Sequence, residues 1–288
     1  MPPVPARSVS RPEPEGRFSG AGGTHLWYRS WPAPARRRAV LLLVHGFGEH
    51  SGRYGHLARA LTSRGFQLFA FDLRGHGRSA GPRGHVTAWS EYLGDLDAFL
   101  RLVRAEQGRQ PLFLYGHSMG AIVALDYARR RPEALRGVVA SGTPLRPGDP
   151  ARPGRIRLAR WLSVVWPRFP LSVGIDPEAL SGRPEVVRAY REDELVFGKA
   201  TARWGTELLD AIDRIERHAG ELEVPLLLVH GGADRIALAS GAREFFRRVR
   251  HTDKAILVYE GARHEPHNDV VGERLVEDLE GWLRAHLM

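Results

Sequence analysis

A serine between two glycines follows an apolar stretch of the chain. Residues 111–120 read P-L-F-L-Y-G-H-S-M-G, and an alanine-rich stretch follows them. The pattern predicts a strand, a sharp turn at Ser118 and a helix over 118–131. Gly116 and Gly120 have no side chain that would collide with the strand or the helix, so the turn can be tight. Such a turn exposes the hydroxyl of Ser118 at the edge of a sheet, and we predict that Ser118 is a nucleophile.

A serine at its ordinary pKa needs a base, which in turn needs a carboxylate to orient it. Asp234 follows one apolar stretch (225–229) and His264 follows the last one (255–259), so both are expected at the same sheet edge as the serine. We predict that His264 is the base and Asp234 is its carboxylate. Two alternatives remain open for these roles. His230 or His267 competes with His264, and Asp234 could instead cap the helix that begins near Ser240.

The chemistry also needs two N–H groups for an oxyanion. The stretch V-H-G-F-G at 44–48 ends an apolar strand and contains two glycines that let its backbone fold tightly. We predict that the backbone amides of Phe47 and Met119 form the oxyanion hole. An ordinary glycine turn is the other interpretation of 45–48, and the serine, acid and histidine loops argue against it.

The elements that must position these residues alternate along the chain. A hairpin is predicted over 17–19 and 24–31, and helices are predicted near 54–63, 88–107, 118–131, 241–249 and 269–286. The other strands are predicted at 39–44, 66–71, 112–115, 137–140, 225–229 and 255–259. These strands are continuously apolar, as in sheets that are covered on both faces. The alternation predicts a mostly parallel α/β sheet with helices on both sides.

One long stretch interrupts this alternation. Residues 144–204 are rich in proline and arginine and contain a bulky apolar cluster, but no clear strand. We predict that they form an inserted cap over the carboxyl edge of the sheet. The predicted division is a loose N-terminal arm at 1–15, a core made of 16–143 and 205–288, and a cap at 144–204.

Composition excludes several classes of protein. The chain has 288 residues, 43% of them hydrophobic, and no cysteine, so it can bury a large core but holds no disulfide or thiolate metal site. Its net charge is +9, and all but Lys199 and Lys254 of its 42 basic residues are arginine. The arginines are scattered and accompany no nucleic-acid motif, so we expect no nucleic-acid partner. The N-terminal residues lack the apolar core of a secretory signal and no apolar run could span a membrane, so a cytoplasmic protein is expected.

Two longer motifs carry a family resemblance. The run H-G-F-G-E-H-S-G-R-Y at 45–54 resembles a segment of monoacylglycerol lipases and their lysophospholipase-like relatives, and D-L-R-G-H-G-R-S at 72–79 is similar to a turn of the same group. The resemblance implies an α/β-hydrolase fold with a sheet of about eight strands and an inserted helical cap. It implies hydrolysis of a carboxylic ester that joins one long acyl chain to a small polar head. It also implies that Glu49, Arg53 and His267 lie near that head, although Glu49 and Arg53 could simply brace the following helix.

The chain departs from the family pattern at two places. Ala121 stands where the family often has a second glycine, which narrows the space near the serine, and the cap cannot be matched residue by residue. We expect the apolar residues of the cap, Trp161 and Trp166 among them, to form the walls of the acyl pocket. Arginines are interleaved with this apolar cluster, so the cap could also contact a membrane surface, although a cap with solvated arginines is the simpler interpretation.

Other functions are compatible with the same three catalytic residues. A broad carboxylesterase, a thioesterase, a proline-type aminopeptidase and a cofactor-free perhydrolase would all use them. A non-catalytic binding protein would be expected to lack at least one of the three. The proposed chemistry needs no cofactor, and the histidines show no metal-ligand spacing, so we expect neither a cofactor nor a metal. The sequence leaves the oligomeric state open.

Overall fold

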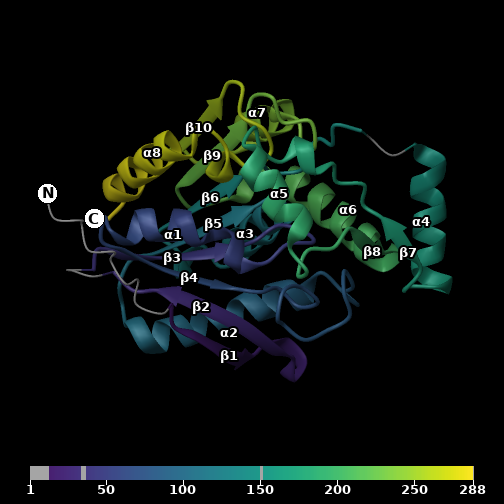
Figure 1. Cartoon of the computed structure of the whole chain (residues 1–288), viewed down its shortest axis with the longest axis horizontal. Helices are drawn as coiled ribbons and strands as arrows, with labels where there is room; N and C mark the ends of the chain where they lie inside the picture. The colour runs from purple at the N-terminus through teal and green to yellow at the C-terminus, as the bar shows by residue number, and fades with distance from the viewer. Residues whose placement is uncertain (1–12, 34–36, 150–151, 288) are drawn as a thin grey trace, which may run out of the picture.

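A twisted sheet forms the centre of the molecule. The computed structural model describes residues 13–33, 37–149 and 152–287. Within them, eight strands form one sheet in the order β1-β2-β4-β3-β5-β6-β9-β10, and β1 and β2 are the antiparallel strands (Figure 1). The strands of this sheet are β1 (Glu15–Ser19), β2 (His25–Trp31), β3 (Ala39–Val44), β4 (Phe66–Phe71), β5 (Leu112–His117), β6 (Gly137–Ser141), β9 (Leu226–Gly231) and β10 (Lys254–Tyr259). The predicted parallel α/β sheet is confirmed.

Helices cover both faces of the sheet. The covering helices are α1 (Gly55–Thr62), α2 (Ser90–Gln107), α3 (Met119–Arg130), α7 (Ala239–Arg248) and α8 (Gly272–Ala285). Alternate residues of β3 enter two separate apolar clusters: Leu42 belongs to the cluster with α2, α3 and α7, and Leu41 to the cluster with α1 and α8. A strand that is buried on both faces needs such a continuous apolar sequence.

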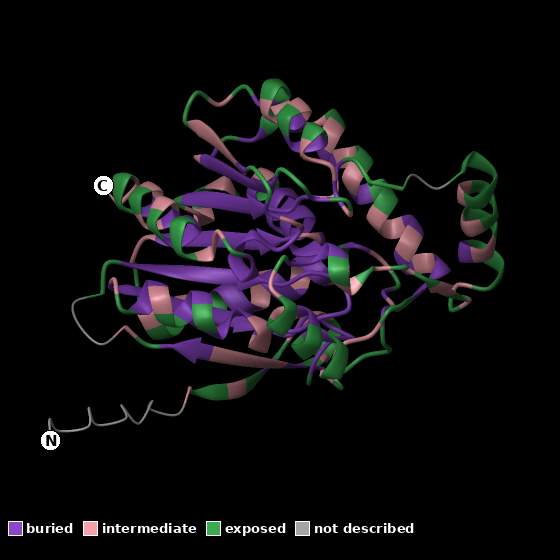
Figure 2. Cartoon of the chain, turned by 45° about the horizontal axis from the view of Figure 1, so that its top comes forward, coloured by how far each residue is buried: buried purple, intermediate pink, exposed green. Residues whose placement is uncertain are grey.

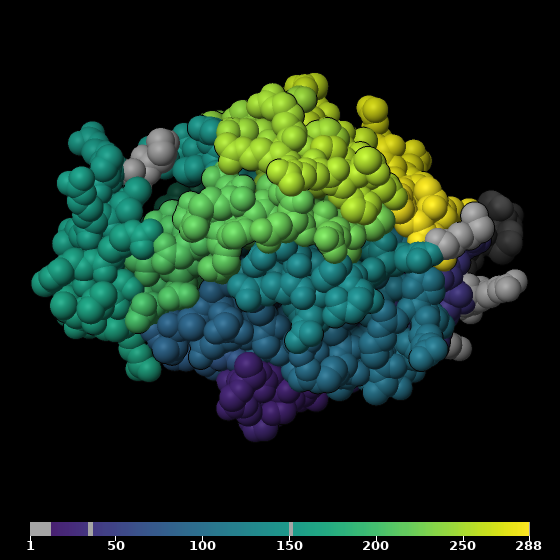
Figure 3. Space-filling model, turned by 180° about the vertical axis from the view of Figure 1, so that it is seen from behind, coloured from purple at the N-terminus to yellow at the C-terminus, as the bar shows by residue number. Residues whose placement is uncertain are grey.

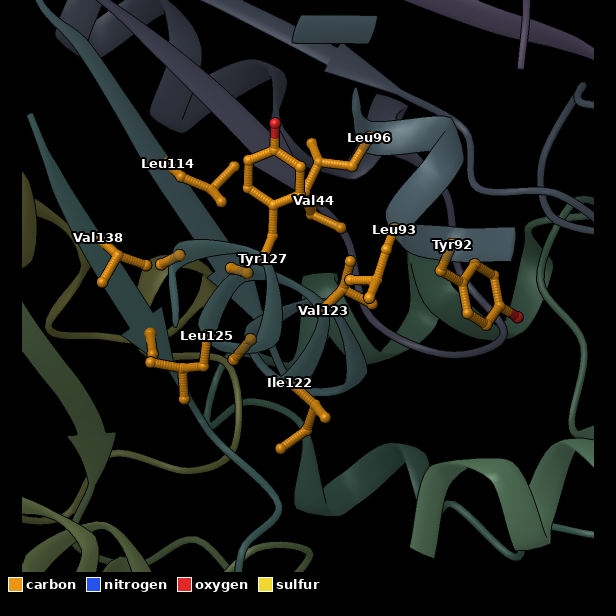
Figure 4. Packing of buried hydrophobic residues seen from close by; sticks show 14 of the residues in the cluster. Val44, Tyr92, Leu93, Leu96, Leu114, Ile122, Val123, Leu125, Tyr127 and Val138 are labelled. Atoms are coloured by element: carbon orange, nitrogen blue, oxygen red, sulfur yellow. The ribbon is translucent and has the colours of Figure 1, made fainter. Parts of the chain in front are cut away.

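The first of these clusters lies under α3. In Figure 4, Tyr127 of α3 lies among Val44 and Leu114 of the strands and Leu96 of α2. Figure 2 shows that the strands and the inner faces of the covering helices are buried. This packing fixes α3, and with it the turn that precedes the helix.

The inserted stretch folds into helices and a short ribbon. Its elements are α4 (Pro153–Val165), β7 (Pro170–Ser172), α5 (Pro184–Glu192), β8 (Lys199–Thr201) and α6 (Ala202–Arg217). The strands β7 and β8 pair antiparallel, so the expectation of a stretch without strands is wrong. They are only three residues long and pair with each other outside the main sheet, which explains their weak sequence signal.

The boundaries of the predicted division stay a prediction. Helix α6 crosses the predicted cap boundary at 204 and continues to Arg217. Ion pairs between Arg214 of α6 and Asp126 of α3 fasten this helix to the core. The predicted N-terminal arm at 1–15 lies almost wholly outside the described residues, and Glu15 already belongs to β1.

Candidate active site

Ser118 occupies a strained turn between β5 and α3. Its backbone angles are φ 52° and ψ −121°, and among the described residues it alone has a positive φ without being glycine. A Cβ atom at Gly116 would lie 2.3 Å from the carbonyl oxygen of Gly120, and one at Gly120 would lie 2.2 Å from the oxygen of Val44. The two glycines therefore permit the close approach of helix and strand that the turn requires. Such strain persists at functional sites where the surrounding packing imposes it.

Three side chains from distant loops meet in a hydrogen-bonded chain. His264 Nε2 lies 3.0 Å from Ser118 Oγ, and His264 Nδ1 lies 2.8 Å from Asp234 Oδ2. A carboxylate can only accept, so the Nδ1 proton points to Asp234 and Nε2 is left to accept the proton of the serine hydroxyl. This is the geometry that a serine nucleophile and its base require.

The surroundings of Asp234 hold its carboxylate in place. Oδ1 accepts hydrogen bonds from the amides of Ile236 (2.8 Å) and Ala237 (2.9 Å), and His230 Nε2 lies 3.2 Å from Oδ2. Both amides precede α7, so the carboxylate closes a turn and does not cap that helix. Burial by itself would raise the pKa of Asp234, but His264, His230 and the amides outweigh it and lower the pKa well below its usual value.

His264 is buried beside this carboxylate. Burial alone would lower the pKa of His264, but Asp234, assisted by Glu265 and Glu49, outweighs burial and raises the pKa. A raised pKa makes the imidazole a better proton acceptor while it stays neutral. His230 donates from Nε2 to the carbonyl of Ala237 at 2.7 Å and does not approach Ser118.

The loop after β3 lies beside the serine. His45 Nε2 accepts from the amide of Leu73 (2.9 Å), which leaves Nδ1 to donate to the carbonyl of Gly46 (2.7 Å). The amide of Gly46 donates to Glu49 Oε1 at 2.7 Å. Hydrogen bonds therefore hold both the amide and the carbonyl of Gly46. Because this carbonyl and the amide of Phe47 belong to the same peptide plane, the direction of the Phe47 amide is fixed as well.

Phe47 and Met119, the predicted oxyanion donors, both line a cavity together with Ser118. Among the described residues, neither backbone amide has a hydrogen-bond acceptor. Two unused N–H groups beside a serine can stabilise a developing oxyanion.

Two cavities of different character meet at Ser118. The larger has a volume of about 430 Å³ and a mostly apolar wall that includes Met119, Ile175, Trp204 and Leu208. The smaller, of about 20 Å³, is lined on its polar side by Glu49, Arg53, His117, His264 and Glu265. The serine thus faces an apolar space on one side and a charged space on the other.

Only some of the predicted substrate-binding residues lie at these cavities. Glu49 and Arg53 line the smaller one, and they also brace the loop, since Arg53 Nη1 donates to Glu49 Oε2 at 2.6 Å. His267 is buried and stacks on Tyr54 with ring centroids 4.7 Å apart. It lines a separate cavity of about 530 Å³ together with His56, and burial lowers its pKa to about 3. The structure therefore does not bring His267 to the smaller cavity.

The two predicted pocket tryptophans point away from the site. Trp161 and Trp166 are 60% and 59% exposed, and neither lines a cavity at Ser118. The expectation that they form the acyl wall does not fit this arrangement. Trp161 lies on the exposed face of α4 and Trp166 directly follows this helix, whereas Trp204 on α6 lines the larger cavity. An apolar cluster in the sequence shows that a helix is amphipathic but not which surface it covers.

A short segment of the cap, which has no signal in the sequence, binds the loop around the histidine. We call residues 177–182 the inner cap segment and residues 260–271 the histidine loop. The amide of His264 donates to the carbonyl of Ala179 (3.2 Å), and the amide of Glu265 donates to the carbonyl of Leu180 (2.8 Å). These hydrogen bonds join backbone groups, so no residue type in the sequence indicates them.

Two side chains of the histidine loop complete this contact. Arg263 Nη1 donates to the carbonyls of Glu178 (2.5 Å) and Ser181 (2.8 Å). Asp269 is buried and accepts from the amide of Gly182 with Oδ1 and from that of Arg263 with Oδ2, at 2.8 and 2.7 Å. The inner cap segment is thus part of the wall that holds His264.

The described residues contain no group of three or more metal-ligating side chains that could hold a metal ion. Every helix formed by the described residues is too short or too polar to cross a bilayer.

Comparisons with known proteins agree with this fold and site. The chain is 34% identical over 280 residues to a monoacylglycerol lipase of Mycolicibacterium smegmatis, covering 97% of this chain and 100% of that one. It is 34% identical over 269 residues to the monoglyceride lipase of Homo sapiens, covering 91% and 88% of the two chains. The crystal structure of a monoacylglycerol lipase of Paleococcus ferrophilus matches with a TM-score of 0.83 at 35% identity, covering 91% of this chain and 99% of that one.

These relatives confirm the resemblance and the α/β-hydrolase fold predicted from the sequence. The family described as "Serine aminopeptidase, S33" matches residues 35–270. The chain therefore belongs to the serine aminopeptidase S33 family, within the α/β hydrolases.

Proposed function

We propose that the protein hydrolyses carboxylic esters that join one acyl chain to a small polar head, such as a monoacylglycerol or a lysophospholipid. One observation carries this proposal: Ser118, hydrogen-bonded to His264, lies where an apolar cavity of about 430 Å³ meets a small polar one. The apolar side has the chemistry to receive an acyl chain, and the polar side has hydrogen-bonding groups for the hydroxyls of the alcohol. The similarity to proteins named monoacylglycerol lipases supports the same substrate class.

The reaction proceeds through an acyl-enzyme. Ser118 Oγ attacks the ester carbonyl while His264 Nε2 takes its proton, and Asp234 stabilises the imidazolium. The amides of Phe47 and Met119 donate to the oxyanion. The imidazolium then protonates the departing alcohol, and a water molecule, deprotonated by the same histidine, releases the fatty acid and restores the serine. Each of Ser118, His264 and Asp234 thus has a role in the proposed reaction.

Replacement of the serine tests the proposal. Ser118→Ala should lower kcat on p-nitrophenyl esters by about 10⁴-fold or more, because no other described side chain at the site replaces the nucleophile. A fluorophosphonate probe should label the wild type but not the variant. Turnover or labelling that persists in Ser118→Ala would show that the nucleophile is elsewhere.

A substrate panel separates the remaining enzyme classes. Monoacylglycerols, lysophospholipids, acyl thioesters and short p-nitrophenyl esters should be compared by kcat/KM with purified protein. We expect the long-chain esters with a small head to be preferred. A flat profile across the esters would indicate a broad carboxylesterase, and a preference for thioesters would indicate a thioesterase.

We also propose that α4 rests on a lipid surface. Trp161 and Val164 of this helix are 60% and 73% exposed, and Trp166, which directly follows it, is 59% exposed. Arginines accompany them at 155, 157, 160 and 168. Figures 1 and 3 show this helix at one end of the molecule, away from the sheet. Apolar side chains flanked by arginines suit the boundary between the acyl chains and the anionic headgroups of a membrane.

Flotation with vesicles tests the contact of α4 with lipid. Wild-type protein should float with vesicles that contain anionic lipid, and Trp161→Ser/Trp166→Ser should float much less. Equal flotation of the two proteins, or none for the wild type, would contradict the contact. The cytoplasmic location expected from the sequence stays a prediction.

A further inference from the structure

Two buried carboxylates share one guanidinium on the polar side of Ser118. The side chains of Glu49, Glu265 and Arg53 are only 3%, 2% and 9% exposed, and all three line the smaller cavity. Arg53 Nη1 lies 2.6 Å from a carboxylate oxygen of each glutamate, and Arg53 Nη2 lies 2.8 Å from Glu265 Oε2. We call these three residues the head-group cluster.

The terminal end of the Arg53 guanidinium is already occupied. Three of its hydrogen bonds go to the two carboxylates, and the ring of Tyr190 covers it with the centroid 4.8 Å from Cζ. Bidentate binding of a phosphate or carboxylate needs two free N–H groups in a plane. The terminal pair of N–H groups is bound to Glu265, so a substrate that leaves both ion pairs intact has only the Nε–H and one Nη2–H of Arg53 left to bind.

The head-group cluster carries one net negative charge. Burial raises the pKa of Glu49 and of Glu265 by itself, but Arg53 outweighs it, so that the pKa of each carboxyl lies below its usual value. The tyrosine and asparagine that also bind the carboxylates are neutral: Tyr54 donates to Glu49 and Asn268 to Glu265. Burial also lowers the pKa of His117, which lines the same cavity, and leaves it uncharged at neutral pH. Two carboxylates therefore face one cation.

We propose that the head-group cluster makes the alcohol side of the site select neutral head groups and reject anionic ones. The enzyme then cleaves monoacylglycerols and discriminates against lysophospholipids, whose glycerol carries an anionic phosphate. This inference rests on the proposed ester hydrolysis and narrows its substrate class. A negative charge brought into this cavity meets the excess carboxylate at short range and with little water to screen it.

The size of the head group also favours glycerol over larger heads, so its effect must be separated from that of charge. The smaller cavity holds about one water molecule. Its outer wall comes from the cap side chains Ile175, Leu180 and Tyr190. A glycerol head enters only when these side chains move, and a glycerophosphocholine head requires more movement. A test of charge therefore needs two heads of equal size.

Esters of ethylene glycol and of glycolic acid provide that pair. 2-Hydroxyethyl decanoate has a neutral head and O-decanoylglycolate an anionic head of nearly the same volume. We expect the wild type to prefer the neutral ester in kcat/KM by at least about tenfold, the effect of one poorly screened charge. In Glu265→Gln the cluster becomes neutral, and the ratio of anionic to neutral turnover should rise about tenfold. In Glu49→Gln/Glu265→Gln the cluster becomes positive, and the ratio should rise further.

Glu178→Gln is the matched control. It makes the same change of charge in the inner cap segment, but its carboxylate is half exposed and lies outside the cavity. We expect the wild-type ratio to persist in this variant. Because each result is a ratio of two substrates on one protein, a general loss of activity does not imitate the effect.

Each outcome has a distinct meaning. Equal turnover of the two esters by the wild type overturns the charge proposal even if the variants fail to fold, and so does an unchanged ratio in Glu265→Gln. In both cases hydrolysis of the neutral ester leaves the proposed function standing. If neither ester is cleaved although Ser118 reacts with a fluorophosphonate, the proposed substrate class itself is wrong.

Discussion

The inner cap segment and helix α4 belong to the same insertion but are attached differently. The inner cap segment is hydrogen-bonded to the histidine loop along its length, and one of these bonds comes from the amide of His264 itself. Helix α4 rests mainly on α6 through Ser163–Thr206 and Arg160–Asp210 contacts of 2.8 and 2.7 Å, and its apolar face is exposed. One part of the cap thus holds His264, the proposed base, and the other part carries the proposed lipid contact. Four variants can break or sharpen this contrast.

The largest effect is expected where the inner cap segment is fastened. Asp269→Ala leaves the amides of Gly182 and Arg263 without their acceptor. Each buried N–H left unsatisfied costs about 1–3 kcal/mol. We expect kcat on a water-soluble p-nitrophenyl ester to fall by about 100-fold, since a misplaced base costs that much, and the melting temperature to fall with it. The exposed Asp210→Ala on α6 is the control; equal losses in both variants would remove the distinction.

A selective effect is expected for α4. Trp161→Ser/Trp166→Ser should leave kcat on the water-soluble ester unchanged, because neither side chain lines a cavity at Ser118. On long-chain substrate presented in vesicles, we expect turnover to fall about tenfold, as the buried apolar area at the lipid surface is lost. A matching loss on the soluble ester would mean that α4 also shapes the site.

A smaller effect is expected in the pH profile. Burial lowers the pKa of His264, but Asp234, Glu265 and Glu49 outweigh burial and raise it above the usual 6.5. In the proposed mechanism the neutral imidazole is the base, so kcat/KM should decline as the pH falls through this raised pKa. Glu265→Gln removes one cause of the rise, and the acid limb should move to lower pH. The profile of Glu178→Gln should match the wild type, and an unmoved limb in Glu265→Gln would contradict the coupling.

The smallest effect is expected at the contact between α4 and α6. Arg160 and Asp210 are both about half exposed, and exposed ion pairs contribute about 0–1 kcal/mol. Arg160→Ala should therefore change the free energy of unfolding by less than about 1 kcal/mol and leave kcat on the soluble ester unchanged. Chemical denaturation measures the first quantity. A large loss would show that α4 supports the core.

Much of the fold could be predicted because its signals are local. Each strand of the parallel sheet is a continuous apolar stretch, and the turn at Ser118 is marked by Gly116 and Gly120. The sequence also selected Ser118, Asp234 and His264, which the structure joins by hydrogen bonds. Their catalytic roles stay predictions until Ser118→Ala is measured.

The rest depends on partners far apart in the chain. Glu265 pairs with Arg53 across 212 residues, and Asp269 binds Gly182 across 87. A pattern of neighbouring residues in the sequence cannot indicate a pair this far apart. The direction in which α4 turns Trp161 could not be predicted for a similar reason, because an amphipathic helix can turn its apolar side to a core or to lipid. The elements that pack beside a helix in the folded protein decide which of these two its apolar side meets.

The distance in sequence between Ser118 and His264 has a consequence for how the protein matures. Their hydrogen bond spans 146 residues, and the histidine loop must also meet the inner cap segment. During synthesis the serine emerges from the ribosome long before its base, and the long-range contacts of the sheet close late. A nascent or truncated chain can therefore contain a complete G-x-S-x-G turn and still be inert. The onset of esterase activity during refolding reports the completion of the whole molecule.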